Sequence, residues 1–138
     1  MDDPVTEFYD RLSPFYRHNM GWDWEAGMRN EGETLSRFLA KRVGNPGPYT
    51  LLDCSCGIGT QAIGLAIQGH RVHATDLSPV SVDCAKHEAA KLGVEMTCGV
   101  ADFRRLEEVI ANTFDVVLSC DNSISHCLKD EDLDAALT

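Results

Sequence analysis

The sequence predicts an α/β fold built on a doubly wound parallel sheet, and three observations lead to this prediction. After residue 48, short β-rich runs alternate with segments of helical length, which is the rhythm of βαβ units. The first run is followed at once by a glycine loop, Gly57-Ile58-Gly59. Acidic residues stand at or just past the ends of three successive runs: Asp53, Asp76 and Asp102. Because such folds bind ligands beyond the carboxyl ends of their strands, a binding site is predicted there.

Residues 1–45 precede this pattern and are predicted to form a helical lid segment. Ser13-Pro14 is expected to cap and open a second helical piece, and Asp23 is expected to cap a longer helix that stops at Gly44. Aromatic residues are dense before residue 25: Phe8, Tyr9, Phe15, Tyr16, Trp22 and Trp24. Aromatic side chains bury large areas, so this density fits either an ordinary packing helix or a lid over a ligand.

Residues 46–138 are predicted to form a ligand-binding half-domain with about four strands. The expected strands cover residues 49–54, 71–75, 94–98 and 114–120. The expected helices cover residues 60–68, 78–92, 106–111 and 130–137. Ser78 followed by Pro79 is typical of a helix N-terminus, and Asp130 is expected to cap the last helix.

Composition excludes several classes of function. The 138 residues include 12 Lys and Arg against 22 Asp and Glu, which gives a formal net charge of −10. This charge disfavours general binding to nucleic acid or to anionic membrane surfaces, and it allows a cationic ligand. The first residues lack the pattern of a signal peptide, so the chain is interpreted as cytoplasmic, with its cysteines free. Their spacing indicates no metal site, and we expect no metal.

Two cofactors fit a glycine loop followed by an acid that can hold a ribose. A dinucleotide brings an anionic pyrophosphate, whereas S-adenosylmethionine (SAM) brings a cationic sulfonium. Asp53 stands four residues before Gly57, and no Lys or Arg lies between Asp53 and Gln68. A carboxylate here repels phosphate and attracts a cation, so the loop favours SAM. Asp76 and Asp102 also admit a plainer interpretation as turn and loop residues.

Four segments together resemble the motifs of class I SAM-dependent methyltransferases: Leu51–Thr60, Val72–Pro79, Val100–Phe103 and Phe114–Ser123. The N-terminal pattern is similar to that of the glycine and glycine/sarcosine N-methyltransferase group: Phe8–Tyr16, Asp23–Glu25 and Arg29. The resemblance implies a Rossmann-like sheet of the class I methyltransferase type with an N-terminal helical lid. Such proteins carry further strands, so the expected sheet is incomplete, and the half-domain is expected to be truncated before the last strands.

The resemblance also implies site residues by their positions. Asp76 would hold the ribose, and Asp102 with Phe103 would hold the adenine edge. The complete implied cofactor set is Tyr16, Arg29, Asp53, Ser55, Gly57, Gly59, Asp76, Leu77, Asp102, Phe103 and Cys120. Asp121, Asn122 and His126 fall where such enzymes bind the acceptor amine, and Asn122, Tyr16 and His126 are the implied catalytic residues. For His126 the plainer interpretation is that it merely begins the last helix.

The implied activity is SAM-dependent methylation of the nitrogen of a small amine or amino acid, such as glycine or sarcosine. We expect alignment of the reactants, and not a dedicated base, to supply most of the rate, with Asn122 orienting the acceptor. One alternative is a non-catalytic SAM-binding fragment or module, which agrees with the hypothesis that residues 1–138 alone are poorly stable and inactive. Another is an NAD-dependent oxidoreductase, which shares the glycine loop.

Overall fold

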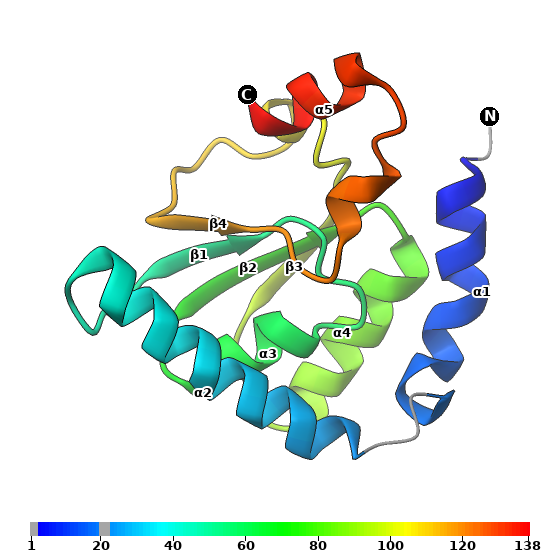
Figure 1. Cartoon of the computed structure of the whole chain (residues 1–138). Helices are drawn as coiled ribbons and strands as arrows, with labels where there is room; N and C mark the ends of the chain where they lie inside the picture. The colour runs from blue at the N-terminus through cyan, green and yellow to red at the C-terminus, as the bar shows by residue number, and fades with distance from the viewer. Residues whose placement is uncertain (1–2, 20–22) are drawn as a thin grey trace.

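The structure, a computed structural model, describes residues 3–19 and 23–138 (Figure 1). The beginning of the predicted helical segment and Trp22 lie outside the described residues. The helices are α1 (Pro4–Asn19), α2 (Trp24–Val43), α3 (Thr60–Ile67), α4 (Pro79–Lys91) and α5 (Asp130–Leu137), with short 3₁₀ turns at η1 (Leu106–Glu108) and η2 (Ser123–His126). The strands are β1 (Thr50–Asp53), β2 (Arg71–Asp76), β3 (Thr97–Val100) and β4 (Val116–Leu118).

The four strands form one parallel sheet in the order β3-β2-β1-β4. In the register, Leu52 of β1 lies opposite His73 of β2 on one side and Val117 of β4 on the other. Because all the strands run the same way, their carboxyl ends meet at one edge of the sheet. This arrangement confirms the predicted α/β class with a doubly wound parallel sheet.

Helices α2, α3 and α4 lie on one side of the sheet, whereas α5 lies toward the other side, and α1 stands beside α4 (Figure 1). Apolar side chains from β1, β2 and α3 form the main core, including the fully buried Leu51, Leu65 and Ala74. Helix α2 crosses α3 where two glycines meet, Gly32 and Gly64. A Cβ built on Gly32 would lie 2.3 Å from the carbonyl carbon of Gly64, so the two backbones are in direct contact.

Helix α1 differs from the prediction because it continues through Pro14 instead of starting anew there. Proline lacks the N–H that would bond the carbonyl of Asp10, but tertiary contacts hold the helix on both sides of this gap. The Ser13 hydroxyl is hydrogen-bonded to that of Ser81 on α4 at 2.7 Å, so Ser13 is a buried contact and not a helix cap. The Ser78 hydroxyl donates to the carboxylate of Asp10.

Three further elements differ in their boundaries. Strand β3 begins at Thr97 and not at residue 94, because the Val94 N–H still donates to Ala89 in the terminal turn of α4. The helix expected at 106–111 is only the 3₁₀ turn η1. Asp130 is the first residue of α5, and Lys129 takes the cap position. The caps at Asp23 and Ser78 and the stop at Gly44 agree with the prediction.

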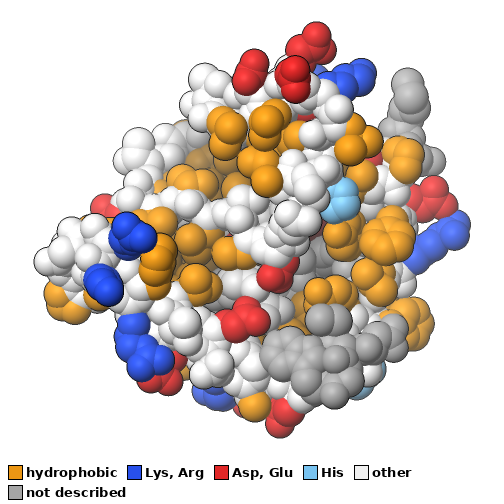
Figure 2. Space-filling model, in the orientation of Figure 1, with side chains coloured by type: hydrophobic (Ala, Val, Ile, Leu, Met, Phe, Trp, Pro, Cys, Tyr) orange, Lys and Arg blue, Asp and Glu red, His pale blue; other side chains and the backbone are white. Residues whose placement is uncertain are grey.

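Charge is distributed unevenly over the molecule. On the face seen in Figure 2, basic side chains gather near the end of α2, whose last turn carries Lys41 and Arg42. Acidic side chains gather over α5, whose first turn carries Asp130, Glu131 and Asp132. Within the described ranges, 3–19 and 23–138, no helix has both the length and the apolar character needed to cross a membrane.

Candidate functional site

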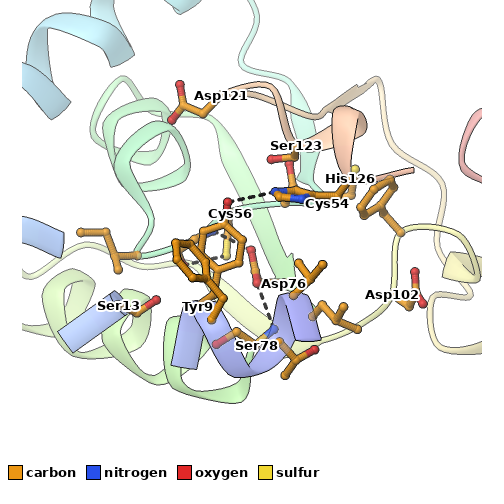
Figure 3. Close-up of a pocket in the computed structure, with 18 of the residues that line it drawn as sticks. Tyr9, Ser13, Cys54, Cys56, Asp76, Ser78, Asp102, Asp121, Ser123 and His126 are labelled. Atoms are coloured by element: carbon orange, nitrogen blue, oxygen red, sulfur yellow. Dashed lines mark hydrogen bonds between the residues drawn. The ribbon is translucent and has the colours of Figure 1, made fainter. Parts of the chain in front are cut away.

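A cavity lies at the carboxyl ends of β1, β2 and β3, between the sheet and α1 (Figure 3). Of the residues singled out from the sequence, nine line this cavity: Tyr16, Ser55, Gly57, Asp76, Leu77, Asp102, Phe103, Asp121 and His126. Five do not line it: Arg29, Asp53, Gly59, Cys120 and Asn122. The chain therefore brings together, in one cavity, residues that the sequence places on separate strand ends.

Asp76 connects the glycine loop to the end of β2. One carboxylate oxygen accepts a hydrogen bond from the Gly57 backbone N–H at 2.8 Å, and the other accepts from the Ser78 N–H at 3.0 Å (Figure 3). Ser78 in turn caps α4 by accepting from the Ser81 N–H. Asp76 is thus a turn residue, as the plainer interpretation had it, and its carboxylate also borders the cavity.

The two glycines of the loop have different surroundings, although both have a positive φ, 53° at Gly57 and 93° at Gly59. A Cβ on Gly57 would meet nothing within 4 Å, so this residue borders open space in the cavity. A Cβ on Gly59 would lie 2.9 Å from the side chain of Ile63. Gly59 therefore serves the packing of α3, whereas Gly57 lets the backbone approach a ligand.

Asp53 is fully buried behind the cavity. One of its carboxylate oxygens accepts from the Ser55 N–H at 3.3 Å, and the other finds no hydrogen-bond partner among the described residues. Burial raises the pKa of Asp53 to about 7; the hydrogen bond from Ser55 lowers this pKa, and the charges of Asp76 and Asp121 raise it. The sequence places Asp53 at the crevice mouth, but the structure places its side chain beneath it.

Helix α1 lines the cavity from the side opposite the sheet and contributes Tyr9 and Tyr16 to it. The Tyr9 hydroxyl is hydrogen-bonded to Nε2 of His126 at 3.0 Å across the cavity (Figure 3). Burial raises the pKa of both tyrosines, and the Asp121 charge raises both further. Trp24 of α2 instead packs in the core and donates its indole N–H to Thr60 at 3.0 Å. Tyr9 and Tyr16 thus belong to the cavity wall and Trp24 to the core, whereas Phe15 is exposed.

Two side chains of the cavity wall were not found from the sequence. The amide nitrogen of Gln61 donates to Glu31 at 2.8 Å and to Asp121 at 2.9 Å, which ties α2 and the end of β4 to α3. Arg104 forms a bidentate ion pair with Asp102, the shortest contact being 2.7 Å. Both partners of Gln61 come from distant elements, so no spacing along the chain could have indicated this bridge.

Residues 121 and 122 have strained backbones at the end of β4. Asp121 has φ 54° and Asn122 has φ 63°, both in the left-handed region that non-glycine residues seldom occupy. The carbonyl of Asn122 accepts from the N–H and the hydroxyl of Ser125, which stabilises η2. Strain of this kind concentrates at functional sites, and here it presents the Asp121 carboxylate to the cavity.

The remaining residues singled out from the sequence lie around the cavity. The Arg29 guanidinium pairs with Glu25 one turn earlier on α2, at 2.9 Å, and is half-exposed. Burial raises the pKa of the Cys120 thiol to about 12, and the charges of Asp53, Asp121 and Glu31 raise it too. Cys120 therefore stays a neutral thiol beside these acids.

Comparison with known proteins gives concordant results. The family described as "Methyltransferase domain" matches residues 51–138. The glycine/sarcosine N-methyltransferase of Parasynechococcus marenigrum is 31% identical over 132 residues, which are 96% of this chain and 42% of that protein. The chain thus spans about two fifths of the length of the curated relatives that it matches most extensively.

Solved structures show the same fold. The CcbJ methyltransferase of Streptomyces caelestis superposes with a TM-score of 0.79 at 20% identity, over 98% of this chain and 52% of that one. The magnesium protoporphyrin IX methyltransferase of Synechocystis PCC 6803 with bound SAM gives a TM-score of 0.71 at 21% identity, over 99% of this chain and 70% of that one. Because the family match covers most of the sequence and the sheet has the same form, this chain belongs to the methyltransferase-domain family.

Proposed function

We propose that this chain binds SAM in the cavity at the strand ends and takes part in methylating the nitrogen of a small amine or amino acid, such as glycine or sarcosine. The observation that carries the proposal is the hydrogen bond from the Gly57 N–H to Asp76 at the cavity wall. It joins the glycine loop to an acid suited to the two hydroxyls of a ribose. The glycine/sarcosine N-methyltransferase among its relatives supports the choice of acceptor.

The residues present fit this cofactor. Gly57 borders open space where the ligand backbone can approach, and the Asp76 carboxylate stands next to it. When ionised, the buried Asp53 adds negative potential beneath the loop, which suits a cation and opposes a pyrophosphate. Leu77 and Phe103 supply apolar surface for a purine ring, and Asp102 supplies an acceptor for its amine.

When bound, SAM supplies an activated methyl group on a cationic sulfur. The protein then has to align an amine with that methyl group and exclude water, which together supply most of the rate in such displacements. Helix α1 covers the cavity, and the Tyr9–His126 pair closes it on one side. We propose that Asn122 and Asp121 orient the amine at the end of β4, and that Tyr16 and His126 face the reacting nitrogen.

A small acceptor is favoured over a nucleic acid. The net charge of −10 repels a phosphate backbone, and the basic residues at the end of α2 are not among those that line the cavity. The six cysteines are all unpaired. We therefore propose a reducing, cytoplasmic location.

Calorimetry with SAM and with S-adenosylhomocysteine tests the binding proposal, and radiolabelled methyl transfer to glycine, sarcosine and RNA tests the acceptor.

We expect D76N to weaken SAM binding by about tenfold or more, because a hydrogen bond to a charged group is lost. The matched control is D83N, on an exposed part of α4. Binding without transfer would favour a non-catalytic module, and binding of NADH in place of SAM would favour an oxidoreductase.

A further inference from the structure

Arg104 is the one Lys or Arg of the cavity wall within residues 3–19 and 23–138. Its Nε and Nη2 atoms hold both carboxylate oxygens of Asp102 at 2.7–3.1 Å, and its backbone N–H donates to one of them at 2.9 Å. The guanidinium also lies 3.9 Å from the carboxylate of Asp3 and 3.4 Å from that of Asp132. One cation therefore joins the start of α1, the loop after β3 and the first turn of α5.

This ion cluster lies at one end of the proposed cofactor cavity. Asp3, Asp102 and Arg104 all line it, next to Phe103. The hydrogen bonds from Arg104 are the first cause of the lowered pKa of Asp102, so the carboxylate stays ionised over the whole physiological range. A bidentate guanidinium pair also fixes the plane of the carboxylate, which a single hydrogen bond would not do.

We propose that Arg104 is a positioning residue that makes the site selective for an amino-substituted purine, a proposal that rests on the SAM-binding function above. Three N–H donors of Arg104 make four contacts with the two oxygens of Asp102, because the Nε–H is shared between them. A carboxylate has about four acceptor positions, so three donors leave one for a ligand in the cavity that Asp102 lines. A fixed, ionised acceptor bonds the exocyclic amine of adenine and repels the carbonyl oxygen that hypoxanthine carries at the same place. Without Arg104, Asp102 can rotate and this discrimination weakens.

The carboxylates around Arg104 restrict which ligands its guanidinium can bind. Three carboxylates share one guanidinium, so the cluster keeps a net negative charge even with Arg104 in place. Among the described residues of the cavity wall, Arg104 is the only Lys or Arg, and Asp102 already engages it. The amine of a neutral purine therefore meets no free Lys or Arg there. Arg104 is therefore not available as a phosphate ligand, which separates this site from one built for a nucleotide with a phosphate at that end.

The test compares S-adenosylhomocysteine with S-inosylhomocysteine, which differ in the amine and the carbonyl of the purine. We expect the wild-type protein to prefer the adenine compound by about tenfold or more in Kd, and R104M to reduce that preference to about threefold or less. R104K should lie between, because an ammonium keeps the charge but lacks the planar fork. If R104M does not fold, the preference measured with R104K still tests the proposal.

Two controls isolate the effect on Asp102. R105M changes the neighbouring, exposed arginine, which pairs with Glu108 at 3.9 Å, and should leave both affinities unchanged. D132N removes one outer partner of Arg104 without touching Asp102, and should leave the adenine preference intact. An unchanged preference in R104M and R104K, with the wild type binding S-adenosylhomocysteine, would overturn this inference alone. Failure of the wild type to bind S-adenosylhomocysteine would overturn the proposed function as well.

Discussion

At the scale of single residues, the carboxyl group of Asp53 has the most unusual environment. Its side chain is wholly buried, one oxygen has no hydrogen-bond partner among the described residues, and burial raises its pKa from an ordinary 3.8 to about 7. A carboxyl group in this position opposes folding whenever it must be ionised. The ionised carboxylate lowers the stability of the fold, and the same negative charge attracts a cationic ligand.

The buried carboxyl group predicts a pH dependence of stability. Between the unfolded pKa near 3.8 and the folded pKa of about 7, the folded state holds a proton that the unfolded state has lost. The contribution of Asp53 to the free energy of unfolding is therefore greatest at low pH and falls as the pH rises through this window, by up to about 4 kcal/mol. Urea unfolding of wild type and D53N across the window measures the difference, and parallel curves would contradict the prediction.

A substitution at Asn122 can separate a catalytic role from a cofactor-binding role, if the new residue keeps the same backbone conformation. Its φ of 63° is strained for alanine, so N122A changes both side chain and backbone. We expect N122G, which keeps the left-handed conformation, to lower turnover by about tenfold or more while the Kd for SAM is unchanged. N112G, in an exposed loop, is the control. Affinity that fell together with turnover would show that Asn122 does not act on the acceptor alone.

Residues at strand ends could be predicted from the sequence, whereas bridging residues could not. Asp76 and Asp102 follow runs of β-forming residues, and a parallel sheet brings such positions together whatever the loops do. Gln61 was hidden because its partners, Glu31 and Asp121, belong to distant segments. Asp53 was placed correctly on its strand, but the alternation of side chains in a short strand did not reveal that it points into the core.

At the scale of elements, the contact between α2 and α3 depends on two glycines. A Cβ on Gly64 would lie 2.5 Å from the carbonyl oxygen of Met28 and 2.9 Å from the Cα of Gly32. We expect G64A to force the helices apart and to cost about 1–3 kcal/mol of stability, as overpacking does. G99A, where the nearest atom would be 3.9 Å away, should be nearly neutral. Chemical denaturation measures both, and equal stability of the two variants would refute the close helix contact.

The boundaries of elements were predicted best where a cap determines them. Asp23 and Ser78 accept the hydrogen bonds of helix N-termini, and Gly44 takes the left-handed conformation at a helix end, so local chemistry suffices there. Strand β3 and the path of α1 through Pro14 depend on tertiary contacts. The hydrogen bond between Ser13 and Ser81 spans 68 positions, and such contacts are invisible to local patterns.

At the scale of the whole molecule, α1 contributes Tyr16 to an apolar cluster, but several of its contacts with α4 and across the cavity are polar. Arg17 pairs with Glu88 on α4 at 3.0 Å, and Tyr9 is hydrogen-bonded to His126. By contrast, α2 is held by the buried Trp24 and Met28. Polar, partly exposed contacts open more readily than an apolar core.

Ligand binding should therefore protect α1 and η2 more than α2. We expect saturating S-adenosylhomocysteine to slow amide hydrogen exchange in α1 and η2 by about tenfold or more, with little change in α2. Hydrogen exchange with and without the ligand measures this, and the α2 peptides serve as the internal control. Protection spread evenly over all helices would show that α1 is not a separate cover of the cavity.

The order of the strands has a consequence for how the site assembles in time. The hydrogen bond between Gly57 and Asp76 closes a loop of 19 positions, whereas β4 reaches β1 through contacts such as Thr50 with Asp115, 65 positions apart. Longer loops cost more entropy to close and slow folding, and a nascent chain presents its N-terminal part first. We therefore expect the ribose side of the cavity to form early in folding, and the acceptor side, around Asp121, to form last.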